Sequence, residues 1–321
     1  MQDKQHISLS LMPTYRCAMD CEYCYLGDDV KSSAYKSDAF IRHLNKRLKE
    51  LSNKYIIDIV EMYGGDLDHF DYGNLCTTIN TYRRYCTNDR IMLRDIRKAN
   101  KLGFKDNQIN ISLNPERRDY LDNLFILKEH PDVNVIVVVT AKLMSDEPGT
   151  MLSLLNNCHG YVTFMPYNNY SPNYPVPYVS NYEYCSYVLQ VLDNYVSHKY
   201  NFKLTNLIML EDCARGCYSP AMRNNIFIEP HGKFACVDFD LDGKEYFKTF
   251  EKLEHWEQRC KQEDIDRAAA CGTCEYFNTC MAEHFKAPNQ QPWYVYTNGD
   301  ICNGYKPLVD WAKARLDGPC N

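Results

Sequence analysis

Residues 17–25 read Cys17-Ala18-Met19-Asp20-Cys21-Glu22-Tyr23-Cys24-Tyr25 and follow an alternating apolar stretch, Ile7 to Met12. Three thiolates at this spacing can hold three irons of a cubane cluster and leave the fourth iron open. A cofactor with an amino and a carboxylate group can chelate that open iron, which makes the cluster a reagent. The alternative is a zinc knuckle or a set of structural thiols, but the triplet follows a first strand and does not lie in a small Cys/His module.

The spacing resembles the CxxxCxxC hallmark of the radical S-adenosylmethionine enzymes, in which an aromatic residue precedes the last cysteine, the place of Tyr23. The resemblance implies that Cys17, Cys21 and Cys24 ligate a [4Fe–4S] cluster and that Tyr23 contacts the cofactor. In that family the cluster reductively cleaves S-adenosylmethionine to a 5′-deoxyadenosyl radical, which takes a hydrogen atom from the substrate. A flavodoxin- or ferredoxin-type protein is the expected electron donor.

Segments typical of strands and helices alternate from residue 7 to about residue 200, which is the pattern of βα units with a parallel sheet. We expect strands at Ile7 to Met12, Ile56 to Tyr63, Arg90 to Leu93, Gln108 to Leu113, Val133 to Thr140 and Tyr161 to Met165. We expect helices at Asp38 to Leu51, Tyr72 to Arg84, Arg94 to Leu102, Arg117 to His130, Thr150 to Asn157 and Tyr182 to Lys199. Six such units predict an α/β fold with a partial (β/α)6 TIM-like barrel over residues 1–204, the core shape of the resembled family.

Ligands of a parallel barrel bind at the carboxyl ends of its strands, so the residues after each strand are candidate cofactor contacts. After the second expected strand, Tyr63-Gly64-Gly65-Asp66 resembles the family's GGE motif, with an aspartate in place of the glutamate. The resemblance implies that Gly64 and Gly65 let the backbone approach the methionyl amine and that Asp66 pairs with it. In isolation, a Gly-Gly-Asp segment is also a common turn.

Three further residues match cofactor contacts of the family. Ser112 and Asn114 stand where the ribose hydroxyls and the methionyl carboxylate are held, and Met165 stands where backbone groups meet the adenine. Ser112 and Asn114 can equally be polar residues at the end of a strand.

A second group of cysteines lies in the C-terminal third of the chain. It comprises Cys213, Cys217, Cys236, Cys271, Cys274, Cys280 and Cys302, with His284 between the last two. The order resembles the SPASM extension of radical S-adenosylmethionine enzymes, which houses two auxiliary iron–sulfur clusters. Two departures are His284 in place of the last cysteine of the CxxCx5Cx3C run and a Gly232-to-Cys236 spacing that is one residue short. The resemblance implies a cysteine-rich SPASM-like domain over residues 205–321.

By that match one auxiliary [4Fe–4S] cluster is held by Cys271, Cys274, Cys280 and Cys302, and the other by Cys213, Cys217, Cys236 and His284. A neutral imidazole at position 284 would raise the potential of its cluster. The alternatives are that His284 is an ordinary helix residue beside a three-cysteine site, or that the whole group forms two structural zinc sites.

The remaining cysteines fit no cluster spacing; they are Cys76, Cys86, Cys158, Cys185, Cys260 and Cys320. Those on expected helices, Cys185 among them, are interpreted as small packed hydrophobic residues. Asp238 and Asp240, just beyond Cys236, are candidates for a catalytic base that takes a proton from a substrate radical, and an acidic surface loop is the alternative.

Composition limits the setting in which the chain works. Sixteen cysteines among 321 residues, without an apolar leader at the first residues, indicate metal-binding thiols in a reducing compartment, so we expect a cytoplasmic protein. No apolar stretch approaches the ~20 residues of a membrane helix. The formal charge of −6 argues against nucleic acid as the main partner. A local basic groove that binds nucleic acid is the alternative.

The resemblance therefore implies an enzyme that functionalises an unactivated C–H bond. Members of this subgroup mostly modify ribosomal peptides or proteins by crosslinking, oxidation or epimerisation, so a peptide or protein is the first expected substrate. The chain begins directly at the expected barrel, which weakens the peptide hypothesis because it leaves no N-terminal leader-binding domain. The second hypothesis is the dehydrogenation or rearrangement of a small molecule, a nucleoside or a modified DNA base. The third is a non-catalytic iron–sulfur or zinc protein, which would gain nothing from an open iron.

Overall fold

The computed structural model of the chain describes residues 4–19, 21, 23, 24, 26, 31–32, 37–166, 179–217, 225–237, 247–280, 294–295, 301–302 and 305–316. The strands of the first part are β1 (Gln5–Leu11), β2 (Tyr55–Met62), β3 (Asn88–Met92), β4 (Ile109–Ser112), β5 (Asn134–Val139), β6 (Tyr161–Pro166) and β7 (Lys203–Leu204). Its α-helices are α2 (Ser37–Lys54), α3 (Tyr72–Tyr82), α4 (Ile96–Lys101), α5 (Tyr120–Glu129), α6 (Ala141–Met144), α7 (Pro148–Leu154) and α8 (Asn181–Ser197). No helix in the described ranges is long and apolar enough to cross a membrane.

The later part of the chain contributes α9 (Thr205–Ala214), β8 (Asn225–Ile228), β9 (Phe234–Val237), β10 (Phe247–Phe250), α11 (Leu253–Cys271), β11 (Tyr294–Val295), β12 (Ile301–Cys302) and α12 (Lys306–Leu316). One ten-stranded sheet runs in the order β10-β9-β8-β1-β2-β3-β4-β5-β6-β7. Neighbours from β8 to β7 are parallel, and β8, β9 and β10 are joined by antiparallel pairing.

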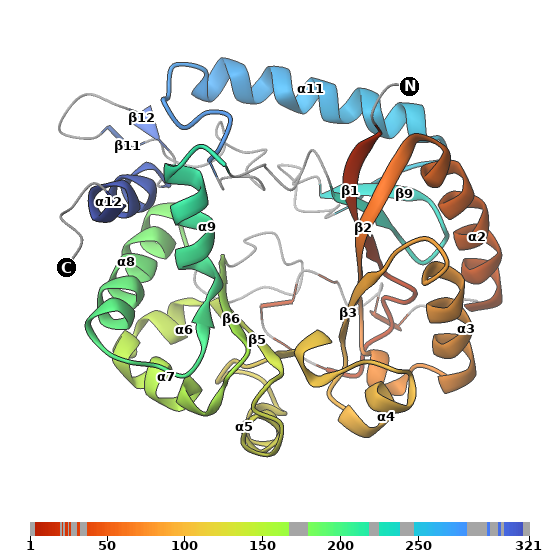
Figure 1. Cartoon of the computed structure of the whole chain (residues 1–321), viewed down its shortest axis with the longest axis horizontal. Coiled ribbons are helices and arrows are strands. Elements are labelled where there is room, and N and C mark those ends of the chain that lie inside the picture. Colours follow the sequence, from red (N-terminus) through yellow and green to blue (C-terminus); the bar gives the residue numbers. More distant parts are fainter. Residues whose placement is uncertain are drawn as a thin grey trace.

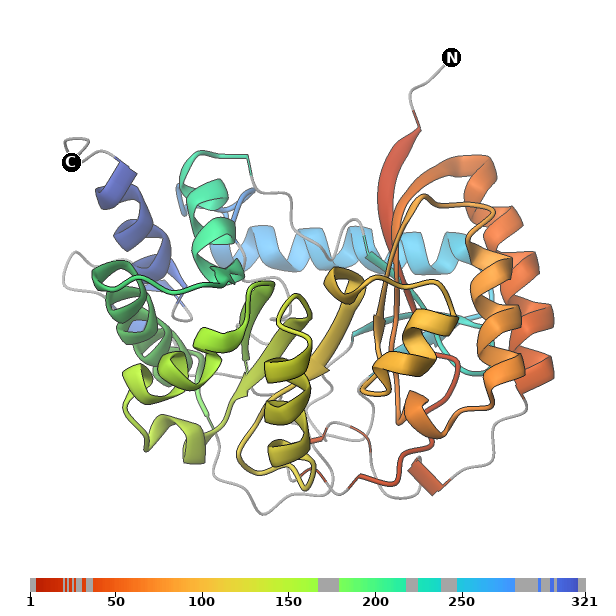
Figure 2. The same ribbon diagram turned by 60° about the horizontal axis from the view of Figure 1, so that its bottom comes forward.

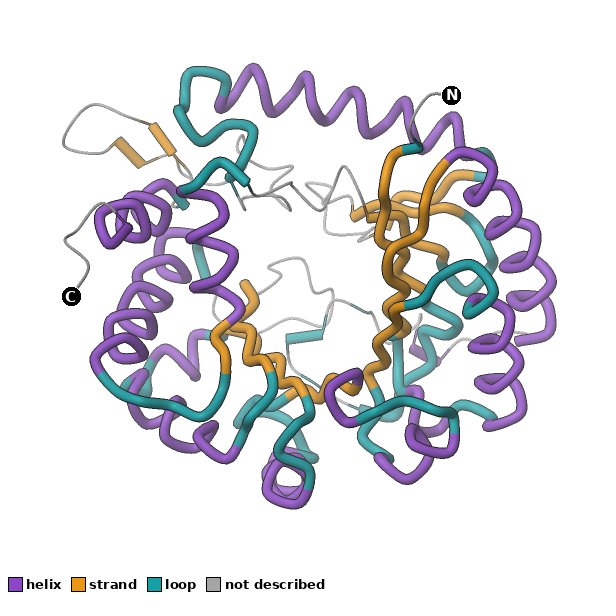
Figure 3. The backbone as a smooth tube through the Cα atoms, in the orientation of Figure 1, coloured by secondary structure: helices purple, strands orange, loops and turns teal. Residues whose placement is uncertain are grey.

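The predicted barrel is confirmed. Each of the six expected strands occurs within two residues of its expected start, and the six expected helices follow them. Figures 1 and 3 show the strands lining the inside of an open ring with the helices outside. In Figures 1 and 2, α11 crosses from the side of α9 to the side of β1, and it contacts β9 and β10.

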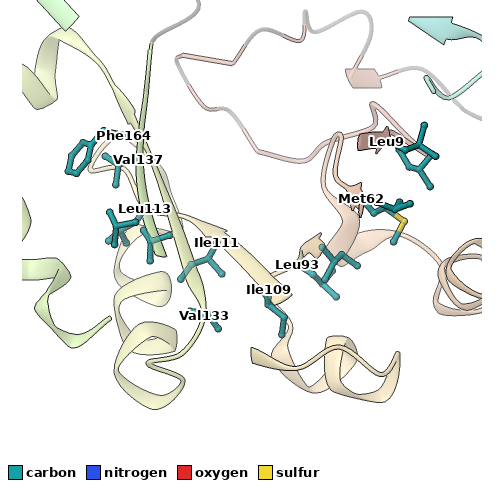
Figure 4. Packing of buried hydrophobic residues seen from close by; sticks show 14 of the residues in the cluster. Leu9, Met62, Leu93, Ile109, Ile111, Leu113, Val133, Val137 and Phe164 are labelled. Carbon is teal, nitrogen blue, oxygen red and sulfur yellow. The ribbon is translucent and has the colours of Figure 1, made fainter. Parts of the chain in front are cut away.

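The core lies between the strands and the outer helices. In α2, Phe40, Leu44, Leu48 and Leu51 recur at spacings of three and four residues, and all four are fully buried. They join one cluster with residues in the strands or directly after them, several of which Figure 4 labels: Leu9, Met62, Leu93, Ile109, Ile111, Leu113, Val137 and Phe164. Burying a leucine or phenylalanine side chain stabilises the fold by about 1.5–3 kcal/mol. This amphipathic pattern explains why the helices were predictable.

The other face of the strands is more polar and more accessible. Glu61, Asn110, Ser112 and Thr163 alternate with fully buried neighbours and are themselves partly exposed. Such alternation gives a strand one face packed on helices and one face toward a solvated interior. Polar groups at the carboxyl ends of the strands can therefore meet a ligand there.

Two asparagine side chains extend the sheet where main-chain pairing stops. Asn114, just after β4, accepts a hydrogen bond from Val138 N at 2.9 Å and donates one to Val138 O at 2.6 Å. Asn206, on α9, accepts from Phe164 N and donates to Phe164 O, both at 2.8 Å. Each amide substitutes for a missing strand neighbour, which satisfies buried backbone groups that would otherwise be costly.

The later part of the chain extends the same sheet beyond β1 and packs a helix near its other end. Strand β8 pairs in parallel with β1, and Ser10 Oγ donates to Asn225 Oδ1 at 3.1 Å. At the other end, α9 packs on β6 and on α12. The predicted domain boundary at residue 204 thus falls within a continuous sheet, and the division into two domains remains a prediction.

We expect Asn206→Ala to lower the free energy of unfolding by about 2–3 kcal/mol, because Phe164 N loses a buried acceptor. Phe164 O keeps the Tyr184 hydroxyl, at 2.9 Å. Urea unfolding of the anaerobic protein measures the change. Asn194→Ala is the control: its amide bonds to Gln190 O on the exposed surface of α8, so its effect should stay within about 0.5 kcal/mol. Equal effects of the two variants would contradict the bracing role of Asn206.

Candidate active site

The three cysteines of the predicted cluster lie in the loop that follows β1. Cys21 is buried, whereas Cys17 and Cys24 are partly exposed. Burial raises the pKa of all three thiols, neighbouring thiols raise it further, and the ammonium group of Lys31 lowers it. The three sulfurs are therefore close enough to influence one another's charge.

Backbone N–H groups point at two of these sulfurs. Met19 N donates to Cys17 Sγ and Leu26 N donates to Cys24 Sγ, both at 3.4 Å. Hydrogen bonds to sulfur favour the thiolate, which is the form that binds iron. Within the described residues, no three Cys, His, Asp or Glu side chains lie close enough together to hold a single metal ion.

The Gly-Gly-Asp segment after β2 pairs with the backbone that leads into this loop. Gly65 N donates to Thr14 O at 2.8 Å, and Asp66 N donates to Arg16 O at 2.9 Å. Gly64 has a φ of +145°, and a Cβ on it would collide with Thr14 O; one on Gly65 would collide with Arg16 O and lie 2.7 Å from the carbonyl carbons of residues 15 and 16. Glycine is therefore required at both positions to seat the cysteine loop. Their approach to a methionyl amine stays a prediction.

Asp66 is held rigidly beside the loop, with its side chain only 4% exposed. Its Oδ1 accepts from Asp68 N at 3.2 Å and from Arg94 Nη2 at 3.5 Å. Its Oδ2 is buried and forms no hydrogen bond with any described residue, although His69 Nε2 lies 3.4 Å away. A buried carboxylate oxygen without a donor is costly. It suits an ammonium group, so the residues present fit the methionyl amine of S-adenosylmethionine.

A network of ion pairs extends from Asp66 to the cysteine loop. Arg94, after β3, donates from Nε to Asp68 Oδ2 at 3.0 Å and from Nη1 to Asp119 Oδ2 at 2.7 Å. Arg117, after β4, donates to both oxygens of Asp119. Sequence reasoning missed this network because both arginines stood at the expected starts of helices. The available signal was their position at the carboxyl ends of two neighbouring strands.

The other predicted cofactor contacts differ in their surroundings. The Tyr23 hydroxyl is buried beside the Arg117 guanidinium; burial raises its pKa, and the guanidinium lowers it. Ser112 is partly exposed at the end of β4, and Met165 is 39% exposed at the end of β6. The amide of Asn114 is fully buried and bonded to Val138. Contact of these residues with a cofactor remains a prediction.

An aromatic cluster unpredicted from the sequence joins the cysteine loop to the later strands. Tyr15 stacks on Phe247 with ring centroids 6.1 Å apart, and Phe247 lies 5.5 Å from Phe227. Tyr63, directly before the two glycines, meets Phe227 edge-on at 6.5 Å. The cluster fixes β8 and β10 against the loop that carries the cysteines.

The structure brings together part of one predicted auxiliary set. Cys302 lies close enough to Cys274 to raise the pKa of the Cys274 thiol, after burial. Lys306 N donates a hydrogen bond to Cys302 Sγ at 3.3 Å. Cys280 and Cys302 both lie near Cys185 on α8. Burial raises the pKa of the Cys185 thiol most, and these two thiols raise it further. From the sequence alone, Cys185 is only a packed helix residue, since no linear spacing ties α8 to residues 280–302.

The other predicted set is described only in part. Cys213, at the end of α9, is buried, and its carbonyl accepts a hydrogen bond from Thr279 Oγ1 at 3.3 Å. Cys236 on β9 is buried as well, whereas Cys217 is exposed. Cys271 ends α11. His284 and Asp238 lie outside the described residues, so both roles remain predictions.

Comparisons with known proteins place the fold. No protein family model matches the chain, and no curated protein matches it significantly. Among solved structures, anSMEcpe with bound AdoMet and the Kp18Cys peptide has a TM-score of 0.64 at 13% identity, over 97% of this chain and 98% of that one. SuiB of Streptococcus suis bound to S-adenosylmethionine has a TM-score of 0.61 at 13% identity, over 87% and 72%. This likeness establishes that the chain has the partial-barrel fold of the radical S-adenosylmethionine enzymes.

We expect Gly65→Ala to displace residues 14–16 and to reduce cluster incorporation, because the added methyl group meets backbone that cannot move independently. Overpacking of this kind costs about 1–3 kcal/mol of stability. The measurements are thermal unfolding and iron content after anaerobic reconstitution. Gly149→Ala, on α7, is the control, since its Cβ would meet Asn194 Oδ1 at 3.4 Å, an ordinary contact. Full iron content and parental stability in Gly65→Ala would show that the close approach is not required.

Proposed function

We propose that this chain is a radical S-adenosylmethionine enzyme. The observation that carries the proposal is the pairing of residues 14–16 with residues 65–66, which sets the Asp66 carboxylate beside the cysteine loop. Burial raises the pKa of the Cys17 thiol most, the Met19 N–H lowers it, and the nearby Asp66 carboxylate raises it further. Asp66 therefore lies close to Cys17. A carboxylate next to three thiols at the carboxyl ends of parallel strands suits a cofactor amine that chelates iron.

Each residue then has a defined task. Cys17, Cys21 and Cys24 would ligate the [4Fe–4S] cluster, and Asp66 would fix the methionyl amine through Oδ2. Ser112 and Met165 would meet the ribose and the adenine. When bound, the cluster and S-adenosylmethionine supply a 5′-deoxyadenosyl radical that takes a hydrogen atom from an unactivated C–H bond. Burial of Cys21 and of Asp66 excludes water from their side of these contacts.

We infer that the substrate is a peptide or protein. SuiB has been solved with its precursor peptide SuiA, and anSMEcpe with the Cp18Cys and Kp18Cys peptides, which supports this inference. A flavodoxin- or ferredoxin-type protein would donate electrons. The proposal includes two auxiliary clusters on the C-terminal cysteines, and a catalytic base at Asp238. Fifteen described cysteines, all free thiols, suit a reducing cytoplasm.

Replacing Cys17, Cys21 and Cys24 together with alanine should remove about a third of the iron and all cleavage of S-adenosylmethionine. The parent should bind about twelve irons, four for each of three clusters. Iron analysis and 5′-deoxyadenosine formation after dithionite reduction give both values. The matched control replaces Cys76, Cys86 and Cys260, three partly buried cysteines outside the proposed ligand sets. Stoichiometric zinc without iron–sulfur absorption in the anaerobic parent would refute the proposed function.

Asp66→Asn should weaken binding of S-adenosylmethionine without loss of iron. The variant keeps the side chain's shape but loses a charge-assisted hydrogen bond worth ~1.5 to 3 kcal/mol, or roughly ten- to a hundredfold in affinity. Asp71→Asn is the control, because this exposed residue caps α3 and asparagine caps equally well. Calorimetric titration of the reconstituted proteins measures the affinities. An unchanged affinity in Asp66→Asn would mean that the amine is held elsewhere.

A further inference from the structure

The sulfur of Cys21, the middle cysteine of the loop, accepts a hydrogen bond from a side chain distant in sequence. Arg117 Nη1 donates to Cys21 Sγ at 3.5 Å, across a sequence separation of 96 residues. The sulfurs of Cys17 and Cys24 accept hydrogen bonds from the backbone N–H groups two residues later in the chain. Only the donor to Cys21 among these three can therefore be removed by a substitution without changing the loop itself.

The guanidinium of Arg117 is fixed in orientation. Its Nε donates to Asp119 Oδ1 at 2.7 Å and its Nη2 to Asp119 Oδ2 at 2.8 Å, so one edge is held by a bidentate pair. The side chain of Arg117 is 13% exposed and that of Asp119 is 4% exposed. A planar fork bound along one edge directs the remaining nitrogen, Nη1, in a defined direction. That direction is toward Cys21.

Asp119 is itself locked in the charged form. Burial alone would raise its pKa, but the guanidinium groups of Arg117 and Arg94 hold it below its usual range. Arg94 also donates to Asp68 and lies 3.5 Å from Asp66 Oδ1. The donor to the cysteine sulfur and the carboxylate proposed for the cofactor amine thus belong to one buried ion-pair network.

We propose that Arg117 is a positioning residue that donates a hydrogen bond to the Cys21 sulfur and raises the reduction potential of the cluster, with Asp119 holding it in place. The inference rests on the proposed function, since it requires a cluster on this loop. Reduction adds negative charge to the cluster and its thiolates. A fixed cation and an N–H group at the sulfur stabilise the reduced state more than the oxidised state.

Arg117→Gln should make the equilibrium constant for reduction about tenfold less favourable, a shift of about 59 mV to lower potential for a one-electron couple. The experiment is a redox titration of reconstituted protein followed by electron paramagnetic resonance. The signal of this cluster is the one that changes when S-adenosylmethionine is added. Iron content should equal that of the parent, which separates a tuning role from a ligand role.

Three further variants sharpen the test. Arg118→Gln removes the same charge from the exposed neighbouring residue and should leave the potential unchanged. Asp119→Asn loosens the guanidinium but also removes a carboxylate that opposes negative charge at Cys21, so its two effects act in opposite directions and the net shift should be smaller than that of Arg117→Gln. Arg117→Lys keeps the charge and loses the fork, so it should give an intermediate shift, and it replaces Arg117→Gln if that variant does not fold.

The outcomes separate the two proposals. A parent that forms no cluster and cleaves no S-adenosylmethionine overturns the proposed function. A parent with an active cluster whose potential equals that of Arg117→Gln and Arg117→Lys overturns the role of Arg117 alone. A shift of equal size in Arg118→Gln also overturns it, because the effect would then come from net charge and not from the contact with Cys21.

Discussion

The hydrogen-bonded pairing of residues 14–16 with residues 65–66 sets the geometry on which the candidate site depends. It continues the ladder between two neighbouring parallel strands, in which Tyr63 N already donates to Leu11 O at 3.0 Å. Because β1 and β2 are held in register by the buried sheet, the cysteine loop and the Asp66 carboxylate are fixed before any ligand arrives. Two glycines permit this approach, and no other residue type would leave room for the Thr14 and Arg16 carbonyl groups. The site is therefore a product of sheet register as much as of its functional groups.

Charge is arranged around the loop so that buried groups compensate one another. Thiols and carboxylates removed from water are unfavourable in their charged forms unless donors or cations lie nearby. Here two arginines at the ends of β3 and β4 share Asp119, and their remaining N–H groups reach Asp66, Asp68 and Cys21. Because Arg94 and Arg117 share Asp119, loss of one charge changes the pairing of the others, so the effects of single substitutions in this network will not add.

The fold was predictable from the sequence because strands and helices each carry a local signal. The apolar repeat of α2 and the run Val135 to Val139 need no knowledge of the rest of the chain. The triplet and the Gly-Gly-Asp segment were equally local. What the sequence did not reveal depends on contacts between distant positions: Arg117 with Cys21, Asn206 with Phe164, and Cys185 with Cys280 and Cys302. Such contacts leave no spacing to recognise, since only the folded sheet and its helices bring these residues side by side.

The parallel pairing of β8 with β1 bears on how the chain is synthesised. Ser10 meets Asn225 across 215 residues, so the strand that carries the cysteine loop has one open edge until most of the chain has left the ribosome. An unpaired edge in a nascent protein invites association with other chains, and closure of so distant a pair is slow. Metal loading of the loop before that moment would fix thiols in an unfinished framework. If the proposed function holds, we expect cluster delivery to follow the synthesis of β8 and its pairing with β1.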